Sequence, residues 1–435
     1  MPDLPDRPSL EFLRKRAKRR RRERGIGLAL AQREIAAEFG FASWPRLVRH
    51  VHATALHGVE RALALADPDL LQVILDAEPG AATQPVSGVR PLILLLRDTS
   101  GAPTDVRRCA ELLIDAGASP SCTTPSADGE WELTASYFAV ERSDVALLRL
   151  LVERGAEPDD DAFYHACERG GADFMEVLYQ PGFESMVNHK LDFEDEAGLR
   201  WLLERGVDVN EHGCLHWAIG RGRGTAILRL LLDAGADPDL PHPDVGLRPL
   251  AAAARCGHLA AYELLEGLGA TADLDPVAER VLAVARGESV RLPDAPPPLP
   301  GIPGTDSRWL LGQLSLLGRT EVVRGLLDAG VDVDSRGWSN FTPLDQAAMH
   351  GRVETVRLLV ERGADLSDCA FDDEGPTPLD SAVWGWRNNR ASDGDYEATV
   401  ALLVAAGAPT RHTPPTGNPR IDALLDSQRS GPSMD

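Results

Sequence analysis

The sequence contains few groupings of residues that could perform chemistry. His212, Cys214 and His216 offer three possible metal ligands within five residues, but a structural zinc site needs four ligands and no fourth lies nearby. Carboxylates cluster in "DFEDE" at 192–196, and "GRGRGTA" at 220–226 is glycine-rich but follows no predicted strand. No nucleophile elbow, phosphate-binding loop, dinucleotide fingerprint or zinc-protease helix is present. We therefore predict no catalytic residues, no metal site and no cofactor, and expect that the protein is not an enzyme.

A strong charge cluster lies near the N-terminus, where nine of the eleven residues between Arg14 and Arg24 are basic. Such a run can bind the phosphates of a nucleic acid or of an anionic membrane surface. It can also be a solvated helix or a clasp on the acidic remainder of the chain, and no aromatic residues interleave it. A nucleic-acid-associated regulator that uses this Arg-rich run is therefore our alternative hypothesis.

The overall charge favours a solvated helix or a clasp, rather than nucleic-acid binding, for this basic run. Residues 1–55 hold 13 Lys/Arg against 6 Asp/Glu, a net charge of +7, and the remaining residues hold 32 against 61, a net charge of −29. A strongly acidic body repels nucleic acid and favours basic partners.

Length and composition limit the class of protein. At 435 residues the chain exceeds the usual single core, which predicts several domains or one elongated array. We see no apolar run of eighteen residues and no apolar segment behind the charged N-terminus, and so expect neither a membrane span nor a secretory signal. Six scattered cysteines without a Cys-x-x-Cys pair fit a reducing compartment. We expect a cytoplasmic, bacterial protein that is a monomer.

Any site on this chain must be positioned by a repeated unit. The pattern Leu-Leu-x-x-Gly-Ala returns as "LLIDAGA" at 112–118, "LLVERGA" at 150–156, "LLLDAGAD" at 230–237 and "LLVERGAD" at 358–365. Self-similarity at roughly thirty residues predicts stacked copies of a small helical unit. A glycine ends the second helix of each copy because it permits a positive φ. The expected glycines are Gly80, Gly117, Gly155, Gly182, Gly206, Gly235, Gly269, Gly330, Gly363 and Gly407.

The clearest copy covers residues 337–367. Thr342 is a good N-cap, Pro343 follows at the first helical position, and Gly351 ends a short first helix. A second helix starts near Val353 and ends at Gly363. One such unit buries too little apolar surface to fold alone, so its neighbours must stack on both of its faces.

These copies resemble the ankyrin repeat family. The resemblance is carried by "FTPLDQAAMHGRVETVRLLVERGAD" (341–365), "PTPLDSAV" (376–383), "RPLAAAARCGHLAAYELLEGLGA" (248–270) and "CLHWAIGRGRGTAILRLLLDAGADPD" (214–239). It implies an all-α solenoid of about nine to ten helix-turn-helix units with hairpin-like loops. "TPLD" stands where the family prefers "TPLH", and only His216 matches that histidine, whose hydrogen bonds tie adjacent hairpins together.

A short helical cap precedes the array. Leu28, Ala31 and Ile35 mark one helix, and a second helix at 44–53 follows Ser43. The aromatic residues Phe39, Phe41 and Trp44 are expected to cover the first repeat. We predict five segments, namely a basic helical N-terminal segment and cap at 1–57, an N-terminal ankyrin array at 58–287, a Pro-rich interruption at 288–306, a C-terminal ankyrin array at 307–410 and a disordered tail at 411–435.

The resemblance also implies where a partner binds. In the family, partners contact the hairpin tips and the solvent face of the first helices, on the concave side. The matching positions are Trp338, Ser339, Phe341, Gln346 and Met349 in one copy, Asp373, Glu374, Ser381 and Trp384 in the next with Trp386 and Arg387 on its insertion, and Val245, Leu247 and Arg255 in an earlier one.

We predict a non-catalytic scaffold or adaptor that binds an unidentified protein through this acidic and locally aromatic surface. Tryptophan and arginine are the residue types that anchor such interfaces. Packing of Trp338 and Trp384 on neighbouring hairpins remains open.

Overall fold

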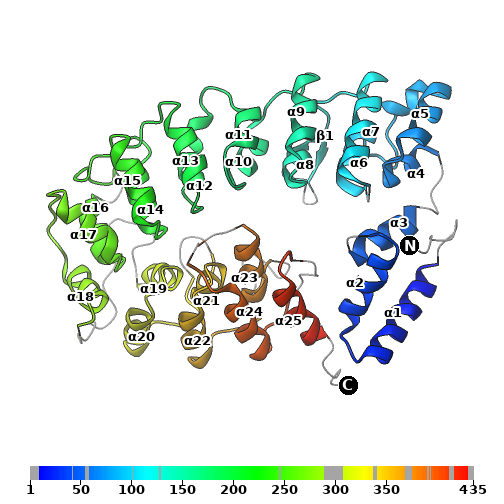
Figure 1. The fold of residues 1–435 in the computed structure, drawn as a ribbon. Helices are drawn as coiled ribbons and strands as arrows, with labels where there is room; N and C mark the ends of the chain where they lie inside the picture. The colour runs from blue at the N-terminus through cyan, green and yellow to red at the C-terminus, as the bar shows by residue number, and fades with distance from the viewer. Residues whose placement is uncertain are drawn as a thin grey trace. The chain divides into compact units, whose positions relative to one another are not determined.

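Helices make up almost all of the regular structure. The structure is a computed structural model, and it describes residues 9–41, 43–53, 58–99, 101–126, 129–243, 246–288, 307–336, 340–367, 375–388, 391, 393–410 and 416–429. These residues form 25 α-helices, two short 3-10 helices and one antiparallel two-stranded sheet (Figure 1). No helix in this part of the chain combines the length and the apolar character that crossing a membrane requires. The chain divides into two compact units, Met1–Phe183 and Glu184–Asp435, and each is described by itself.

The first unit begins with three helices that share a small core. They are α1 (Leu10–Arg24), α2 (Leu28–Glu38) and α3 (Trp44–Ala53), so both helices predicted for the cap are present. The core contains Leu13, Ala17, Ile35, Ala36, Leu47 and Val51, all buried. Phe39, Phe41 and Trp44, predicted to cover the first repeat, pack against this cluster. They do so because α1, in addition to its basic residues, supplies Leu13 and Ala17 to the cluster.

Four helix pairs follow in the first unit. They are α4 (Gly58–Leu65) with α5 (Pro68–Ala77), α6 (Pro91–Asp98) with α7 (Pro103–Asp115), α8 (Ala135–Glu141) with α9 (Val145–Glu153), and α10 (Asp160–Cys167) with α11 (Asp173–Leu178). The first helices α4, α6, α8 and α10 pack side by side, and so do the second helices α5, α7, α9 and α11 (Figure 1). The strands β1 (Thr123–Pro125) and β2 (Glu132–Thr134) form a hairpin directly before α8.

The second unit continues the same arrangement. Its helix pairs are α12 (Val187–Lys190) with α13 (Glu196–Leu203), α14 (Cys214–Gly220) with α15 (Thr225–Asp233), α16 (Pro249–Arg255) with α17 (Leu259–Gly267), α19 (Ser307–Leu316) with α20 (Thr320–Asp328), α21 (Pro343–Met349) with α22 (Val353–Glu361), and α23 (Pro378–Arg387) with α24 (Tyr396–Ala405). The helix α18 (Pro276–Ala285) lies beside α16, and α25 (Pro419–Arg429) packs on α24. Of the two 3-10 helices, η1 (Pro79–Ala82) belongs to the first unit, and η2 (Phe183–Met186) begins at the last residue of that unit.

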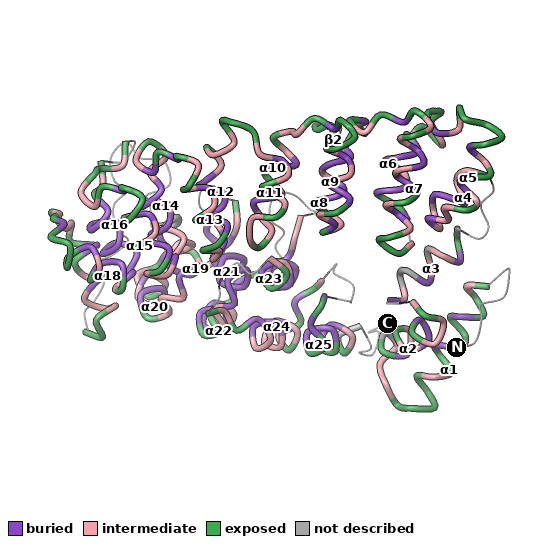
Figure 2. Tube along the Cα trace, turned by 45° about the horizontal axis from the view of Figure 1, so that its top comes forward, coloured by how far each residue is buried: buried purple, intermediate pink, exposed green. Residues whose placement is uncertain are grey.

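The helix boundaries follow from local sequence. Thr342 and Asp345 form a capping box at the start of α21, with Pro343 at the first helical position. Gly351 after this helix has a φ of 65°, the conformation that glycine was predicted to provide. Buried residues follow one side of the helices in Figure 2, and the connecting loops are mostly exposed. This pattern is expected of units that are stable only when stacked.

Nine of the ten predicted loop glycines adopt the expected backbone. Their φ values lie between 83° and 105°, whereas Gly80 is not among the positive-φ residues. The prediction for Gly80 is wrong because α5 already ends at Ala77 and Pro79 starts the 3-10 helix η1, in which Gly80 lies.

The predicted Pro-rich interruption at 288–306 lies, apart from Glu288, outside the described residues. Helices on both sides of it contribute to one core cluster, with Val277 and Val281 from α18 and Leu310 and Leu311 from α19. The division of the array at this point stays a prediction, as does the count of nine or ten repeats.

The predicted disordered tail from residue 411 is wrong for residues 416–429. Asn418 caps α25 by accepting a hydrogen bond of 2.9 Å from the N–H of Arg420, and Pro419 begins the helix. Ile421 and Leu425, one turn apart, are fully buried in the same core cluster as α24. The helix forms because it covers the apolar face that the last repeat would otherwise leave open.

Candidate interaction surface

The predicted binding residues fall into four groups. Trp338, Ser339, Asp373, Glu374 and Val245 lie outside the described residues. Phe341, Leu247 and Trp384 are partly buried, and Trp386 and Arg387 are exposed. The remaining four, Arg255, Gln346, Met349 and Ser381, are buried.

The predicted solvent exposure is wrong for those four residues, because neighbouring first helices pack closely. The guanidinium of Arg255 forms an ion pair of 2.7 Å with Asp275, which caps the adjacent helix α18. Gln346 and Met349 belong to α21, which packs between α19 and α23. The hydroxyl of Ser381 on α23 faces Asp345 on α21 at 3.4 Å. A binding role for these four residues would require the first helices to separate.

A close approach of α21 and α23 sets the position of the tryptophans on α23. A Cβ on Gly385 would lie 2.0 Å from the carbonyl oxygen of Met349, so no larger residue fits. Trp384 and Trp386 flank this contact. The ring of Trp386 lies 6.3 Å from that of Tyr396 and remains 37% exposed. It is therefore available to a partner.

Within the described repeats, the structure exposes two further aromatic residues that the sequence reasoning missed. Trp131, in the hairpin between β1 and β2, is 68% exposed, and Tyr164 on α10 is 42% exposed. The N–H of Trp131 donates to the hydroxyl of Ser126 at 3.1 Å, and Thr134 of β2 donates to Asp159 at 3.0 Å. This second bond ties the hairpin to the next repeat. The Asp-Gly pair of "SADGEW" is a turn signal that could have revealed this hairpin.

The exposed apolar side chains are distributed unevenly between the two helices of a repeat. Trp131, Tyr164 and Trp386 lie in a hairpin or on first helices, whereas Val73 on α5 and Leu268 at the end of α17 belong to second helices. In the described repeats, the large exposed aromatic residues thus mark the side formed by the hairpins and first helices. Aromatic residues are enriched at protein interfaces.

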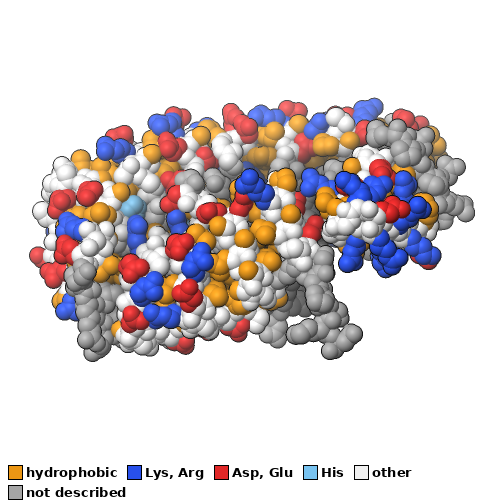
Figure 3. Space-filling view, turned by 60° about the horizontal axis from the view of Figure 1, so that its bottom comes forward, with side chains coloured by type: hydrophobic (Ala, Val, Ile, Leu, Met, Phe, Trp, Pro, Cys, Tyr) orange, Lys and Arg blue, Asp and Glu red, His pale blue; other side chains and the backbone are white. Residues whose placement is uncertain are grey.

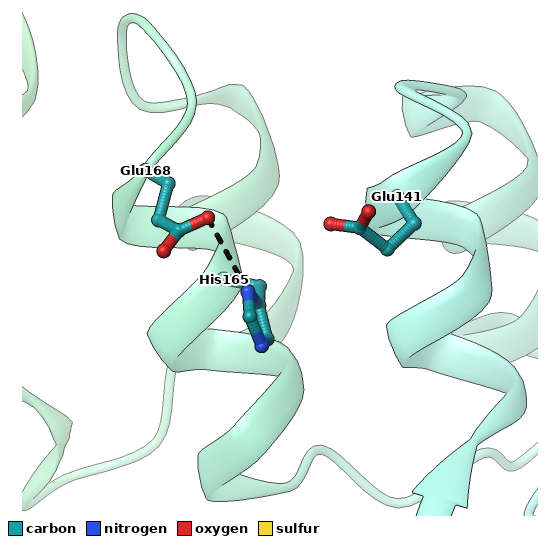
Figure 4. Close-up of side chains that lie close together, drawn as sticks. All are labelled: Glu141, His165 and Glu168. Carbon is teal, nitrogen blue, oxygen red and sulfur yellow. Dashed lines mark hydrogen bonds and ion pairs between the residues drawn. The ribbon is translucent and has the colours of Figure 1, made fainter. Parts of the chain in front are cut away.

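A histidine lies among carboxylates on this side of the first unit. Glu141 at the end of α8, and His165 and Glu168 of the α10 segment, bring their ligand atoms within 4.8 Å of one another (Figure 4). Nδ1 of His165 is 3.3 Å from Glu168 and Nε2 is 3.8 Å from Asp161. Burial alone lowers the pKa of His165, but the hydrogen bond with Glu168 and the surrounding carboxylates outweigh it and raise the pKa above its ordinary value.

His216, the last residue of the sequence motif at 212–216, has a structural role. Nε2 of His216 lies 2.8 Å from the carbonyl oxygen of Leu247, just before α16. This bond ties one repeat to the next, as predicted. Burial lowers the pKa of His216 to about 4, so the imidazole is neutral and donates this bond.

The basic run forms ion pairs with the next helix. Arg16 contacts Glu38 at 2.8 Å, Arg20 pairs with Glu34 and Glu38, and Arg24 pairs with Glu34. The Lys and Arg side chains of α1 gather at the right of Figure 3. These pairs lie within the N-terminal helices and are not the predicted clasp on the acidic remainder of the chain, which stays a prediction.

Antiparallel helix pairs that stack first helix on first helix and second helix on second helix define a helical repeat protein. A family model described as ankyrin repeats (many copies) matches residues 313–359 and 344–403, and one described as ankyrin repeat matches residues 210–243. Residues 210–243 and 313–403 therefore carry ankyrin repeats. No curated protein matches it.

Proposed function

We propose that the chain is a non-catalytic scaffold that binds a protein partner through the side formed by its hairpins and first helices. Ankyrin repeats generally mediate protein–protein interaction. The observation that carries the proposal is that each unit exposes aromatic residues on its own hairpins and first helices, Trp131 and Tyr164 in the first unit and Trp386 in the second. Each offers a large contact area with few rotatable bonds, which lowers the entropic cost of binding.

The charge of this side indicates the chemistry of the partner. Glu130 and Glu132 flank Trp131, and Asp160 and Asp161 begin the helix that carries Tyr164. A partner with basic residues around an apolar anchor would complement this arrangement. In the second unit, the exposed Arg387 beside Trp386 adds a positive charge.

Affinity capture from cells of the source organism tests the proposal with a matched pair of variants. The test variant is Trp131→Ala plus Trp386→Ala. The control, Val73→Ala plus Leu268→Ala, removes exposed apolar side chains, 66% and 56% exposed, from the second helices. We expect the captured partner to be lost with the test variant and kept with the control. Equal retention by both variants would reject the proposed surface.

The alternative hypothesis, a nucleic-acid-associated regulator, gains no supporting observation. Arg16, Arg20 and Arg24 form ion pairs with α2. These ion pairs reduce the number of arginines that can bind phosphates. Deleting residues 1–24 and measuring DNA and RNA retention across a salt series separates the two hypotheses, because phosphate contacts weaken steeply with salt.

A further inference from the structure

Glu141, His165 and Glu168 have the chemistry and the proximity of a metal-binding group. Carboxylate oxygen and imidazole nitrogen are ligands of Zn²⁺ and of other divalent transition-metal ions. The three ligand atoms lie within 4.8 Å of one another. Figure 4 shows Glu141 and Glu168 extending toward each other from neighbouring helices, with His165 beside them. A small rotamer adjustment would bring the three atoms around one ion.

The surroundings of the imidazole also suit a metal ligand. Nδ1 of His165 faces Glu168 at 3.3 Å, while Nε2 faces the carboxylate of Asp161 at 3.8 Å. Histidines that bind a metal through one nitrogen usually donate the other N–H to a carboxylate or carbonyl, which fixes the ring. Asp161 occupies that outer position, and it lies on the same helix as His165.

The charge of the group favours a divalent cation. Three carboxylates, those of Glu141, Asp161 and Glu168, surround His165, and the guanidinium of Arg169 pairs with Glu141. With a neutral imidazole the set carries two negative charges, which a divalent ion neutralises. Nη2 of Arg169 lies 2.5 Å from Glu141, so an ion must compete with this arginine for the carboxylate.

We propose that Glu141, His165 and Glu168 form a binding site for a divalent transition-metal ion, with Zn²⁺ as the best-suited ion. The ion joins α8 to α10 and so links two consecutive repeats on the side proposed for partner binding. Water completes its coordination, because Glu141 is exposed.

The test uses the full chain, stripped with EDTA and then titrated with Zn²⁺ alone in a calorimeter. We expect one-to-one binding and a higher melting temperature with Zn²⁺. The affinity should fall at least about 10-fold in His165→Gln and in Glu168→Gln, because each change removes a direct ligand. Arg169→Gln removes the competitor of the ion and should bind Zn²⁺ more tightly than the unchanged chain. Glu153→Gln, at an exposed carboxylate on the second helix α9, is the matched control and should bind as the unchanged chain does.

Melting curves in EDTA establish that each variant is folded before its affinity is compared. Two results would overturn the site: no binding up to about 100 μM Zn²⁺, or one-to-one binding that His165→Gln and Glu168→Gln leave unchanged. In the second case the ion is held elsewhere on the chain. Weaker binding by Arg169→Gln would also contradict the assignment of Glu141 as a ligand.

Discussion

The hydroxyl of Thr410 donates a hydrogen bond of 2.7 Å to Oδ1 of Asp380, thirty residues earlier in the chain. Asp380 is buried, and its other oxygen accepts from the N–H of Thr377 in the cap of α23. One repeat earlier, Asp345 closes the cap of α21 in the same way and faces Ser381. Aspartate in "TPLD" therefore both caps its own helix and links it to the next segment, much as His216 links to Leu247.

We predict that Thr410→Val lowers the free energy of unfolding by about 1–3 kcal/mol, because a buried carboxylate loses a hydrogen-bond donor. The control is Ser367→Ala, whose hydroxyl bonds the exposed Asp365 at 2.8 Å, and this change should cost less than about 0.5 kcal/mol. Urea unfolding measures both values. Equal costs would show that the link between Thr410 and Asp380 contributes nothing specific.

The neutral imidazole of His216 should make stability depend on pH. Its pKa is about 4 in the folded chain because the ring is buried, against about 6.5 in an unfolded chain. Between these values the unfolded chain binds a proton that the folded chain does not, so the free energy of unfolding falls as the pH drops from 6.5 to 4.

The variant His216→Gln keeps a hydrogen-bond donor and removes this titration. Relative to it, we expect the unchanged chain to lose on the order of 2 kcal/mol between pH 7 and pH 4.5. Urea unfolding at several pH values provides the comparison. A difference between the two proteins that is constant with pH, or that grows in favour of the unchanged chain on acidification, would contradict a neutral His216.

The helix pairs could be predicted because their signals are local. Thr342, Pro343 and Gly351 lie within ten residues and each determines its own backbone conformation. The burial of Arg255 and Ser381 could not be predicted in this way, since it depends on how closely neighbouring first helices pack. Their positions in the family's repeat predicted that they lie on a solvent-exposed face. In this structure the neighbouring first helices cover that face.

Candidate sites were also hard to predict, because their residues are distant in the sequence and meet only when the repeats stack. Glu141 and His165 come together only because α8 stacks on α10, and nothing in the residues between them indicates this contact. The exposure of Trp131 likewise depends on the hairpin that carries it. Among the described loops, this one alone contains paired strands. The helix α25 was missed because its apolar residues are few and stand in a polar segment.

Leu425→Ala tests whether α25 closes the array. Leu425 is fully buried against the last repeats, and its truncation should cost about 2–5 kcal/mol. Leu268→Ala, at a residue that is 56% exposed, should change the free energy of unfolding by less than about 0.5 kcal/mol. Denaturant unfolding distinguishes the two. A cost for Leu425→Ala as small as that for Leu268→Ala would mean that α25 does not stabilise the second unit.

The buried cysteines should resist modification. Cys109, Cys122, Cys167, Cys214 and Cys256 are free and buried, and burial raises the pKa of Cys109 and Cys214 to about 12 and that of Cys256 to about 11. Their thiolate is therefore scarce at neutral pH, and the thiolate is the reactive form.

Cys369 lies outside the described residues, so the test uses Cys369→Ser. We expect no thiol of this variant to react with a disulfide reagent at pH 8 within minutes, and five to react once the chain is unfolded in urea. Rapid reaction of a thiol in the native chain would show that a repeat opens readily.

Hydrogen exchange of the chain with and without its captured partner tests the binding surface most directly. We predict that the partner slows amide exchange at 129–141 and 160–167, at 375–388, or at both sets of residues, which belong to the hairpin and the first helices. The second helices at 145–153 and 396–405 should exchange as in the free chain. Slowed exchange confined to those second helices would contradict the proposed surface.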